Sequence, residues 1–573
     1  MTHEPQGATS PRGETSLDGE HVDVLIEGSD LPQVISAACL SSLGYKVLLL
    51  EPTSNYGGVV NGPLEAALLF DSNGPGRAEN EQVDGVRLLE NGGHSLTNIG
   101  ELVQNRTPRL QLELQPRFYF AADALLDLVV GSGAASYLFF QPVDNLFWVQ
   151  ATSLNDTNPV CVCVPCTKAA VTRSDDLQLA EKRWLMRSLR SCLILASRST
   201  ADDPLSPALD VSDEERSTLL QQWSSAGASA SLLQQLERDL PASKPSHRWG
   251  FITALLQDIY AWGIEDSPAD PIAWPEGVER VALFFWSVLR FHTSTPFLCC
   301  KFGSTEIIQA FARRCAVKGG TIALQRKVQA IGKRKQGQAR DSEGPLLTVS
   351  TEHGEEIQCN MAVVVPVSAA RGANGANRLI RFVGIRRDPL RYRAPAGSDR
   401  SATEHALFVV RFKENCTCTE GSSIPNALYI WQISSTAGVC PPGYYLVYAE
   451  ADFQAASRQN GAPLESITTE LTSLRRALTC ALRCLVSDDA SPKENDAAFL
   501  GQVFAAYAFY DTPVPPSSIR VHTRTDSEQV TASYSYGRTD GIVRATREIL
   551  LHILEDNPAQ RQALNTFFGS PSQ

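Results

Sequence analysis

The apolar and polar positions along the chain are patterned most clearly between residues 21 and 51. An apolar run, VDVLI, leads into Gly28, a stretch with helical spacing follows, and a second apolar run, KVLLLE, ends at Glu51. Short apolar runs on either side of a helix are typical of a βαβ unit. The pattern predicts a strand, a loop, a helix and a second strand, which is the start of an α/β domain.

Residues 174–291 have apolar residues at helical spacing instead. The segment SDDLQLAEKRWLMRSLRSCLILA opens with Ser174 and two aspartates, which suit a helix N-terminus. Trp184 and Leu185 then fall on one apolar face with Leu177 and Ala180. Further helical stretches are ERSTLLQQW, SASLLQQLERDL, WGFITALLQDIYAW and VERVALFFWSVLRF. Strand-like runs flank this region: FWVQATSLNDTNPVCVCVP precedes it, MAVVVPVS, HALFVVRFK and ALYIWQIS follow it, and GIVRATREILLHILE predicts a terminal helix.

This order of predicted strands and helices indicates a discontinuous α/β domain that is interrupted by an all-helical domain. We assign residues 21–173 and 292–556 to the α/β domain and residues 174–291 to the helical domain. Residues 1–20, which are polar and rich in Pro, Gly and Ser, are expected to form a flexible N-terminal tail, and residues 557–573 a C-terminal tail.

The composition argues against several classes of protein. The net charge of −12 over 573 residues argues against a general nucleic-acid binder, which needs a basic surface against phosphates. The N-terminus lacks the apolar core of a signal peptide, and no apolar run approaches the roughly 20 residues of a membrane span. We therefore expect a cytosolic protein with mostly free thiols among its 14 cysteines. Cys161, Cys163 and Cys166 have no matching second cluster and alternate like a strand, so a structural role is expected.

The loop after the first strand departs from a dinucleotide site. Such a site uses three glycines, for a tight turn, for the approach of the pyrophosphate and for close packing of the helix on the strand. Here only Gly28 is present, Asp30 brings a negative charge to the second position, and Gln33 adds bulk at the third. We therefore expect no FAD or NAD cofactor, and we interpret Glu51 as a solvated strand-end carboxylate rather than a ribose ligand.

Four blocks, in order, carry a resemblance to a known family. They are the βαβ start with Tyr56-Gly57-Gly58, DLVVGSGAASYLFF, VPCTKAAVTRSDDLQLAEKRWLMRSL and TPFLCCKFGSTEIIQAFARRCAVKGGTIAL. Together they resemble the Rab GDP-dissociation inhibitors and Rab escort proteins. Thr305 and Ile308 replace a Gly and a Pro of that family, and Lys301-Phe302 stands where Leu-Tyr is usual, so the chain looks like a divergent member.

The resemblance implies a flavoprotein-like fold that carries Rab small GTPases in their GDP form and needs no nucleotide cofactor. The lost glycines are understandable on this view, because the first βα unit becomes a packing and docking element. The family's Rab-binding platform corresponds to Tyr56, Glu306 and Arg313 in this sequence. Glu306 and Arg313 are seven residues apart, so they share a helical face, and an ion pair between them is the alternative interpretation.

The resemblance also implies two sites in the helical domain. A geranylgeranyl lipid needs a dry groove, for which the candidate lining residues are Trp184, Leu185, Leu189, Phe251, Leu255 and Ile259. The alternative for these residues is an ordinary helix-bundle core. The family's contact with Rab geranylgeranyltransferase corresponds to Phe284 and Arg290, with a fully buried helix as the alternative.

The escort branch of the family is favoured by the long loops, by Cys166 after Val164-Pro165, and by Phe284 and Arg290. It implies a non-catalytic accessory component of Rab geranylgeranyltransferase with transient membrane contact. A GDP-dissociation inhibitor is the alternative within the family, and an FAD-dependent oxidoreductase of the amine-oxidase type is the alternative of another class. No catalytic constellation or metal spacing is recognisable by motif.

Overall fold

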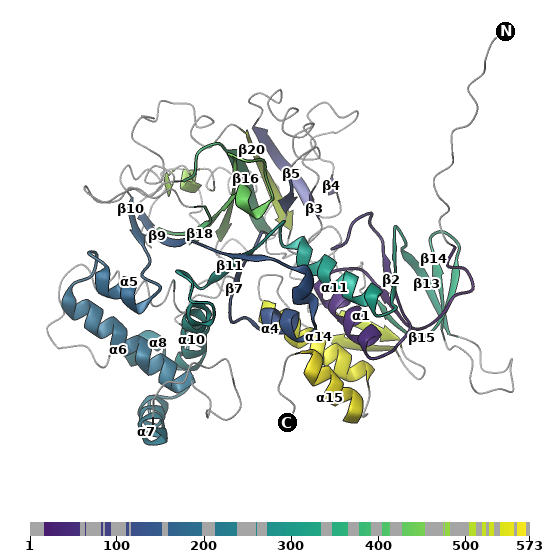
Figure 1. Ribbon diagram of the computed structural model, residues 1–573, viewed down its shortest axis with the longest axis horizontal. Coiled ribbons are helices and arrows are strands. Elements are labelled where there is room, and N and C mark those ends of the chain that lie inside the picture. The colour runs from purple at the N-terminus through teal and green to yellow at the C-terminus, as the bar shows by residue number, and fades with distance from the viewer. Residues whose placement is uncertain are drawn as a thin grey trace, which may run out of the picture.

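The protein is described here from a computed structural model (Figure 1). The residues that the structure describes are 16–57, 63–64, 82–83, 86–92, 110–113, 116–151, 159–196, 212–237, 259, 272–333, 347–364, 378–390, 404–412, 427–452, 474, 476–478, 480–481, 503–510, 518–522, 527–531, 539–554 and 558–568.

The first large sheet has eight strands, ordered β12-β2-β1-β15-β14-β13, with β21 paired to β15 and β22 paired to β21. Its centre is parallel, because β1 pairs in parallel with β2 and β15, and β2 with β12. The strands are β1 (His21–Glu27), β2 (Val47–Glu51), β12 (Thr321–Leu324), β13 (Val328–Lys333), β14 (Leu347–Thr351), β15 (Glu356–Val364), β21 (Ser518–His522) and β22 (Ser527–Thr531).

The second large sheet has nine strands in the order β10-β9-β17-β18-β19-β16-β20-β5-β4, and it is antiparallel except between β9 and β17. Its strands are β4 (Gln82–Val83), β5 (Val86–Gly92), β9 (Asn145–Ala151), β10 (Val160–Cys163), β16 (Arg378–Arg386), β17 (Ala406–Phe412), β18 (Ala427–Ser434), β19 (Tyr445–Asp452) and β20 (Val503–Tyr510). Two small sheets join β7 (Phe118–Phe120), β11 (Phe297–Cys300) and β8 (Phe140–Pro142), and β3 (Pro63–Leu64) with β6 (Leu112–Glu113).

The helices form two groups, one at the left of Figure 1 and the other near its centre. One group covers the eight-stranded sheet and shares its apolar core: α1 (Leu31–Ser42), α4 (Ala124–Gly131), η1 (Ala134–Tyr137), α11 (Thr305–Val317), α14 (Thr539–Ile553) and α15 (Pro558–Phe567). The other, called the helical group below, is α5 (Lys168–Arg173), α6 (Leu179–Ala196), α7 (Asp213–Ser224), α8 (Leu232–Glu237) and α10 (Trp274–Arg290). The short η4 (Ser435–Ala437) follows β18.

The predicted start of the α/β domain is confirmed by β1, α1 and β2. Pro32 lies in the first turn of α1, where its missing N–H leaves no helical hydrogen bond unmade. All residues of α1 from Leu31 to Ser41 are buried, because the helix packs between the sheet, α11 and α14. The predicted strand pair before the helical region is β9 and β10, and the predicted terminal helix is α14.

Both predicted tails need correction where the structure describes them, at residues 16–20 and 558–568; residues 1–15 and 569–573 lie outside the described residues. At the C-terminus, residues 558–567 form α15, with Leu564, Phe567 and Phe568 buried in the core around α1, and Gln560 Nε2 donates a hydrogen bond to the Tyr45 hydroxyl (2.9 Å). At the N-terminus, residues 16–20 are held against the eight-stranded sheet, with Leu17 buried.

The helical region also begins differently from the prediction. A short helix, α5, ends at Arg173, and α6 starts at Leu179 rather than at Ser174. The buried Glu181 carboxylate accepts the backbone N–H of Gln178 (2.6 Å), so it supplies the N-terminal hydrogen bond that the sequence had suggested for Ser174. Among the helices in the described part of the chain, none is both long and apolar enough to cross a membrane.

Candidate functional site

The loop that would hold a dinucleotide is filled by the protein's own side chains. Ser29 Oγ donates to Glu51 Oε2 (2.5 Å) and accepts the backbone N–H of Gly57 (2.8 Å), while the backbone N–H of Thr53 donates to Glu51 Oε1 (2.8 Å). Glu51 is only 1% exposed, so the expectation of a solvated carboxylate is wrong. The acid instead ties the ends of β1 and β2 to the turn that carries Tyr56.

These residues do not fit FAD or NAD. Glu51, the acid in the position of a ribose ligand, is already satisfied by Ser29 and Thr53. The Gln33 side chain is buried and folds back to within 3.7 Å of the position that a Cβ on Gly28 would take. Asp30 is the N-cap residue of α1, so a negative charge stands where an incoming diphosphate would approach. No cofactor chemistry is therefore assigned to this loop.

The three residues predicted to bind a Rab GTPase lie around α11 and the apolar core beneath it. Tyr56 is half-buried against that core. Glu306 is in the first turn of α11, and partial burial raises the pKa of its carboxyl above the usual value. Arg313, two turns later, is exposed, and its guanidinium lies over the ring of Tyr137 at 4.7 Å from the centroid.

The predicted alternative, an ion pair between Glu306 and Arg313, is not among the ion pairs of the described residues. Arg313 is oriented by the aromatic ring of Tyr137 instead, through a cation–π contact. Its charged face is therefore held in one place while it stays open to solvent. The structure does not test the Rab-binding role of Tyr56, Glu306 or Arg313, which stays a prediction.

A residue that the sequence analysis missed holds the N-terminus of α11. Glu113, on β6, is buried, and its carboxylate accepts the backbone N–H groups of Ser304 and Thr305. Burial raises its pKa to about 7, against the opposing effects of these hydrogen bonds and of nearby Arg117. No local signal identifies it, because its partners lie about 190 positions later in the chain.

The predicted lipid-groove residues lie in one apolar core. Trp184, Leu185, Leu189 and Ile259 are all buried in a cluster that also includes residues of α10 and of the nine-stranded sheet. Phe251 and Leu255 lie outside the described residues. This arrangement is what the helix-bundle alternative expects, and a lipid role for these residues stays a prediction.

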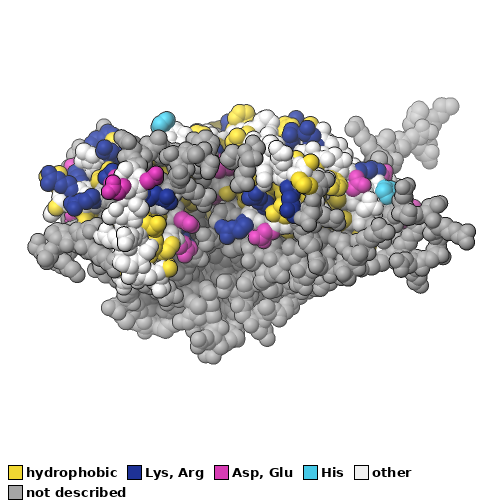
Figure 2. Space-filling model, turned by 90° about the horizontal axis from the view of Figure 1, so that it is seen from below, with side chains coloured by type: hydrophobic (Ala, Val, Ile, Leu, Met, Phe, Trp, Pro, Cys, Tyr) yellow, Lys and Arg dark blue, Asp and Glu magenta, His cyan; other side chains and the backbone are white. Residues whose placement is uncertain are grey.

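The surface of the helical group is polar and partly basic. Figure 2 shows Lys and Arg side chains gathered at the end of the molecule where this group lies, and α6 contributes exposed Arg183, Arg187 and Arg190. Between α6 and α7 there is an open pocket of about 450 Å³, lined by Arg187, Arg190, Glu215 and several hydroxyl side chains. Ile194 and Leu219 also line it, and Arg190 and Glu215 form an ion pair there (3.0 Å), so the pocket is of mixed polarity.

The two residues predicted to contact the prenyltransferase make internal contacts. Phe284 is 1% exposed and packs against Phe120 and Phe297, as the buried alternative expects for this side chain, and its role in binding the prenyltransferase stays a prediction. Arg290 pairs with Asp127 (2.7 Å) and donates to the carbonyl of Ala121 (2.8 Å).

The exposed residues at this end of α10 are different ones. Leu289 is 45% exposed and Phe291 is 52% exposed. The apolar periodicity of the sequence did not indicate that Leu289 and Phe291 would be exposed, because the run VALFFWSVLRF is apolar on more than one helical face.

The three cysteines of the CxCxxC pattern lie on and after β10. Cys161 is half-buried, Cys163 is exposed and Cys166 is buried. Within the described part of the chain, no group of three or more His, Cys, Asp or Glu side chains is placed to hold a metal ion. The structural role expected for these cysteines remains a prediction.

Comparison with known proteins finds similarity to one group of Rab-related proteins. A family model described as GDP dissociation inhibitor matches residues 265–512. The Rab proteins geranylgeranyltransferase component A of Drosophila melanogaster is 25% identical over 463 residues, covering 79% of this chain and 78% of that protein. Rab escort protein 1 of Arabidopsis thaliana is 24% identical over 471 residues, covering 75% and 77%.

The crystal structure of Rab GDI from Plasmodium falciparum has the same fold. It superposes with a TM-score of 0.55 at 16% identity, over 93% of this chain and 98% of that one. The interrupted α/β architecture predicted from the sequence thus agrees with a GDI-like fold. The family model and the two relatives show that the chain is similar to Rab GDP-dissociation inhibitors and Rab escort proteins, and the superposition shows a GDI-like fold.

Proposed function

We propose that this protein is a Rab escort protein. It binds newly made Rab GTPases in their GDP form, presents them to Rab geranylgeranyltransferase as a non-catalytic accessory component, and delivers the prenylated product to membranes. The observation that carries the proposal is that two relatives named as this component or as an escort protein match 79% and 75% of the chain. The protein acts in the cytosol and contacts membranes transiently.

The arrangement of α11 supports the binding half of this proposal. Arg313 is exposed and oriented, Glu306 is half-buried at the other end of the same helix, and Tyr56 lies against the core beneath it. A guanidinium that is fixed before its partner arrives loses less entropy on binding, and Arg and Tyr are enriched among interface residues that dominate affinity. The helical group is the proposed lipid site, since its α6–α10 core is apolar.

A GDP-dissociation inhibitor is the second candidate, because the matching family model carries that description. The two activities are separated by a reconstituted assay with purified protein, a GDP-loaded Rab, Rab geranylgeranyltransferase and geranylgeranyl diphosphate. An escort protein supports transfer of the lipid to the Rab. A protein that extracts prenylated Rab from vesicles but does not support transfer is an inhibitor, and that result would overturn the proposal.

The purified protein is also expected to be colourless. The loop after β1 is filled by Gln33 and by the Ser29–Glu51 hydrogen bond, so FAD has no room for its diphosphate and no free ribose ligand. An absorbance spectrum with flavin bands near full occupancy would support the oxidoreductase alternative. A spectrum without them, together with binding of a GDP-loaded Rab, supports a carrier.

Replacing Arg313 by alanine is expected to weaken binding of a GDP-loaded Rab by about 1–3 kcal/mol, the range of an interface hot spot. The free energy of unfolding should change by no more than about 0.5 kcal/mol, because the side chain is exposed. Titration of the Rab and thermal unfolding are measured on the same variant. Lys318→Ala, which removes an exposed cation just beyond the same helix, is the matched control and should leave the affinity unchanged.

If the Rab affinity is unchanged and the melting temperature is lowered, Arg313 stabilises η1 through its contact with Tyr137 and does not bind the Rab. Tyr56 would then be the better candidate for the central contact.

A further inference from the structure

The turn between β11 and α11 has an unusual backbone. Phe302 has a φ of 66° and Gly303 a φ of 99°, so two consecutive residues occupy the left-handed region. Glycine adopts this region freely, whereas a bulky residue such as phenylalanine is strained there. Strain of this kind persists only where the surrounding structure determines the conformation, and it is concentrated at functional sites.

One side of the turn is held by η4. The backbone N–H of Phe302 donates to the carbonyl of Ala437 (2.6 Å), and the phenyl ring lies on Gly438. A Cβ at Gly438 would be 2.5 Å from the ring atoms, so the contact requires glycine. The turn is thereby attached to the end of β18 in the nine-stranded sheet.

The other side is held by Glu113. The carboxylate accepts the N–H groups of Ser304 and Thr305, and the Ser304 hydroxyl lies 3.5 Å from Glu113 Oε2. A Cβ at Gly303 would be 2.6 Å from Glu113 Oε1, so this glycine leaves room for the carboxylate. The backbone N–H of Glu113 donates to the hydroxyl of Tyr448 on β19 (3.2 Å), which anchors the Glu113 backbone to the same large sheet.

Glu113 supplies the cap that the local sequence does not. Ser304 is the N-cap residue of α11, yet its side chain makes no capping hydrogen bond. The first N–H groups of a helix need an acceptor, and a carboxylate there also interacts favourably with the helix dipole. The start of α11 is therefore fixed by a residue far away in the sequence rather than by its own first turn.

We propose that Glu113 is a positioning residue for GTPase binding: by holding the N-terminus of α11 against the nine-stranded sheet, it sets the orientation of Glu306 and Arg313. The inference rests on the proposed function, because it takes α11 as the surface that receives the Rab. Glu306 follows the capped residues directly, and Arg313 lies two turns along the same rigid helix.

The test measures the dissociation constant of a GDP-loaded Rab for the full-length wild type, Glu113→Ala, Glu113→Gln and Glu113→Asp. Alanine removes the acceptor and is expected to weaken binding on the order of 10-fold, a typical effect of a buried hydrogen-bonding group. Glutamine keeps an acceptor oxygen at the same reach and should stay within about 3-fold of wild type. Aspartate shortens the side chain by one methylene, so the dissociation constant of Glu113→Asp should lie between those of the glutamine and alanine variants. This variant also tests the inference if Glu113→Ala does not fold.

A double-mutant cycle with Arg313→Ala separates positioning from a general loss of stability. If Glu113 acts through α11, Glu113→Ala should cost clearly less affinity in the Arg313→Ala background, because the side chain that it positions is gone. Hydrogen exchange of the Ser304 and Thr305 amides should also be faster in Glu113→Ala than in wild type.

Wild-type affinity in folded Glu113→Ala and Glu113→Asp would overturn the inference and leave the proposed function intact. Strictly additive losses in the cycle would do the same. If the wild-type protein binds no GDP-loaded Rab, the proposed function fails and the positioning role fails with it.

Discussion

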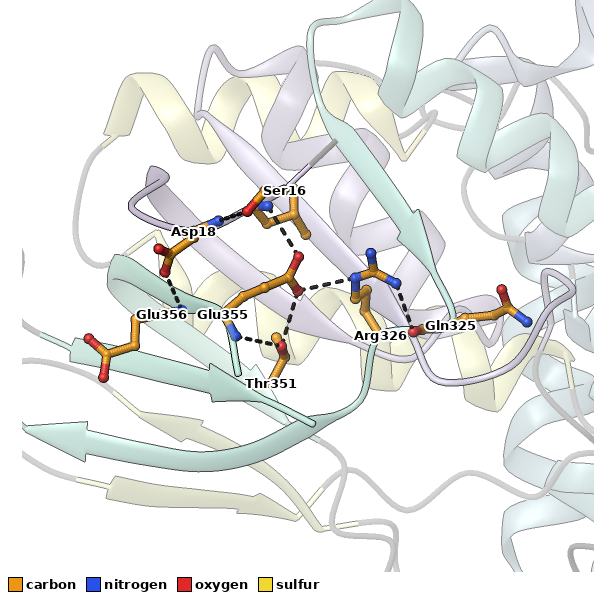
Figure 3. A network of polar contacts seen from close by, with 8 residues as sticks. Ser16, Asp18, Gln325, Arg326, Thr351, Glu355 and Glu356 are labelled. Carbon is orange, nitrogen blue, oxygen red and sulfur yellow. Dashed lines mark hydrogen bonds and ion pairs between the residues drawn. The ribbon is translucent and has the colours of Figure 1, made fainter. Parts of the chain in front are cut away.

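Replacing Glu355 by alanine is expected to lower the free energy of unfolding by about 3–5 kcal/mol, the usual effect of removing one partner of a buried ion pair. Glu355 Oε2 lies 3.1 Å from Arg326 Nε, and both side chains are 9% exposed. The same carboxylate accepts the Thr351 hydroxyl (3.0 Å), as Figure 3 shows, and the backbone N–H of Leu17 (3.2 Å). The variant leaves the Arg326 charge buried without this partner.

A double variant tests whether the loss comes from breaking this buried ion pair. Arg326→Met combined with Glu355→Leu replaces both charges by apolar groups of similar size and should recover most of the stability, because such replacements are often neutral or stabilising. Glu352→Ala is the matched control. It removes an acid that pairs with Lys327 at 3.1 Å, but the two side chains are 53% and 45% exposed, so the change should stay within about 1 kcal/mol.

Equilibrium unfolding in urea measures all three variants. If Glu355→Ala is as stable as Glu352→Ala, the expected loss is contradicted, and other groups or water must solvate the Arg326 guanidinium in the variant. Limited proteolysis adds a local readout, because Glu355 also holds the segment around Leu17, and Asp18 accepts the backbone N–H of Glu356 (3.0 Å). Cleavage near residues 16–20 should therefore be faster in Glu355→Ala than in the control.

This network also shows where prediction from the sequence ends. The strand and helix pattern of residues 21–51 is local, since apolar spacing decides it within a few residues, and the structure confirms it. The segment before it is polar, so it was expected to be a flexible tail. Within it, residues 16–20 are held by partners more than 300 positions away, which no local pattern specifies.

The carboxylates of the site were hard to interpret for the same reason. Glu51 ends a strand, where acids are usually solvated, but the fold places the Ser29 hydroxyl and the Thr53 amide against it. Glu113 sits in a short strand and meets the start of α11 only in the folded protein. A buried acid becomes predictable only when its hydrogen-bond donors are known.

Residues 558–567 were missed because the segment is short and mostly polar, although its few apolar residues share one helical face. Leu564 and Phe567 bury one narrow face of α15 against a core that other elements have built. In α10 the opposite difficulty arises, because Phe284, Phe285 and Trp286 are consecutive and one helical face cannot hold all three. Phe284 faces the core, while the other two are partly exposed.

Replacing Phe284 by alanine is therefore expected to destabilise the protein by about 3–5 kcal/mol, the range for removing a buried phenylalanine. The ring packs edge-on against Phe120 (centroids 6.4 Å apart) and Phe297 (6.5 Å), at the junction of α10 with the three-stranded sheet. Those neighbours belong to strands, which cannot collapse readily into the cavity, so little of the lost packing should be recovered.

Phe291→Ala is the matched control, since it removes the same ring from the exposed end of the helix, where Phe291 is 52% exposed. Its stability should change by no more than about 0.5 kcal/mol. Unfolding is followed by tryptophan fluorescence, because Trp184, Trp223 and Trp274 lie in the same core as Phe284.

The two variants also distinguish packing from docking if the protein serves the prenyltransferase. With Phe284 in the core, affinity for Rab geranylgeranyltransferase should follow the folded fraction of Phe284→Ala, whereas replacing an exposed docking residue would lower affinity without lowering stability. A stable Phe284→Ala variant that no longer binds the transferase would place Phe284 on the docking surface, and α10 would then have to rotate or shift from the position that its contacts with Phe120 and Phe297 define.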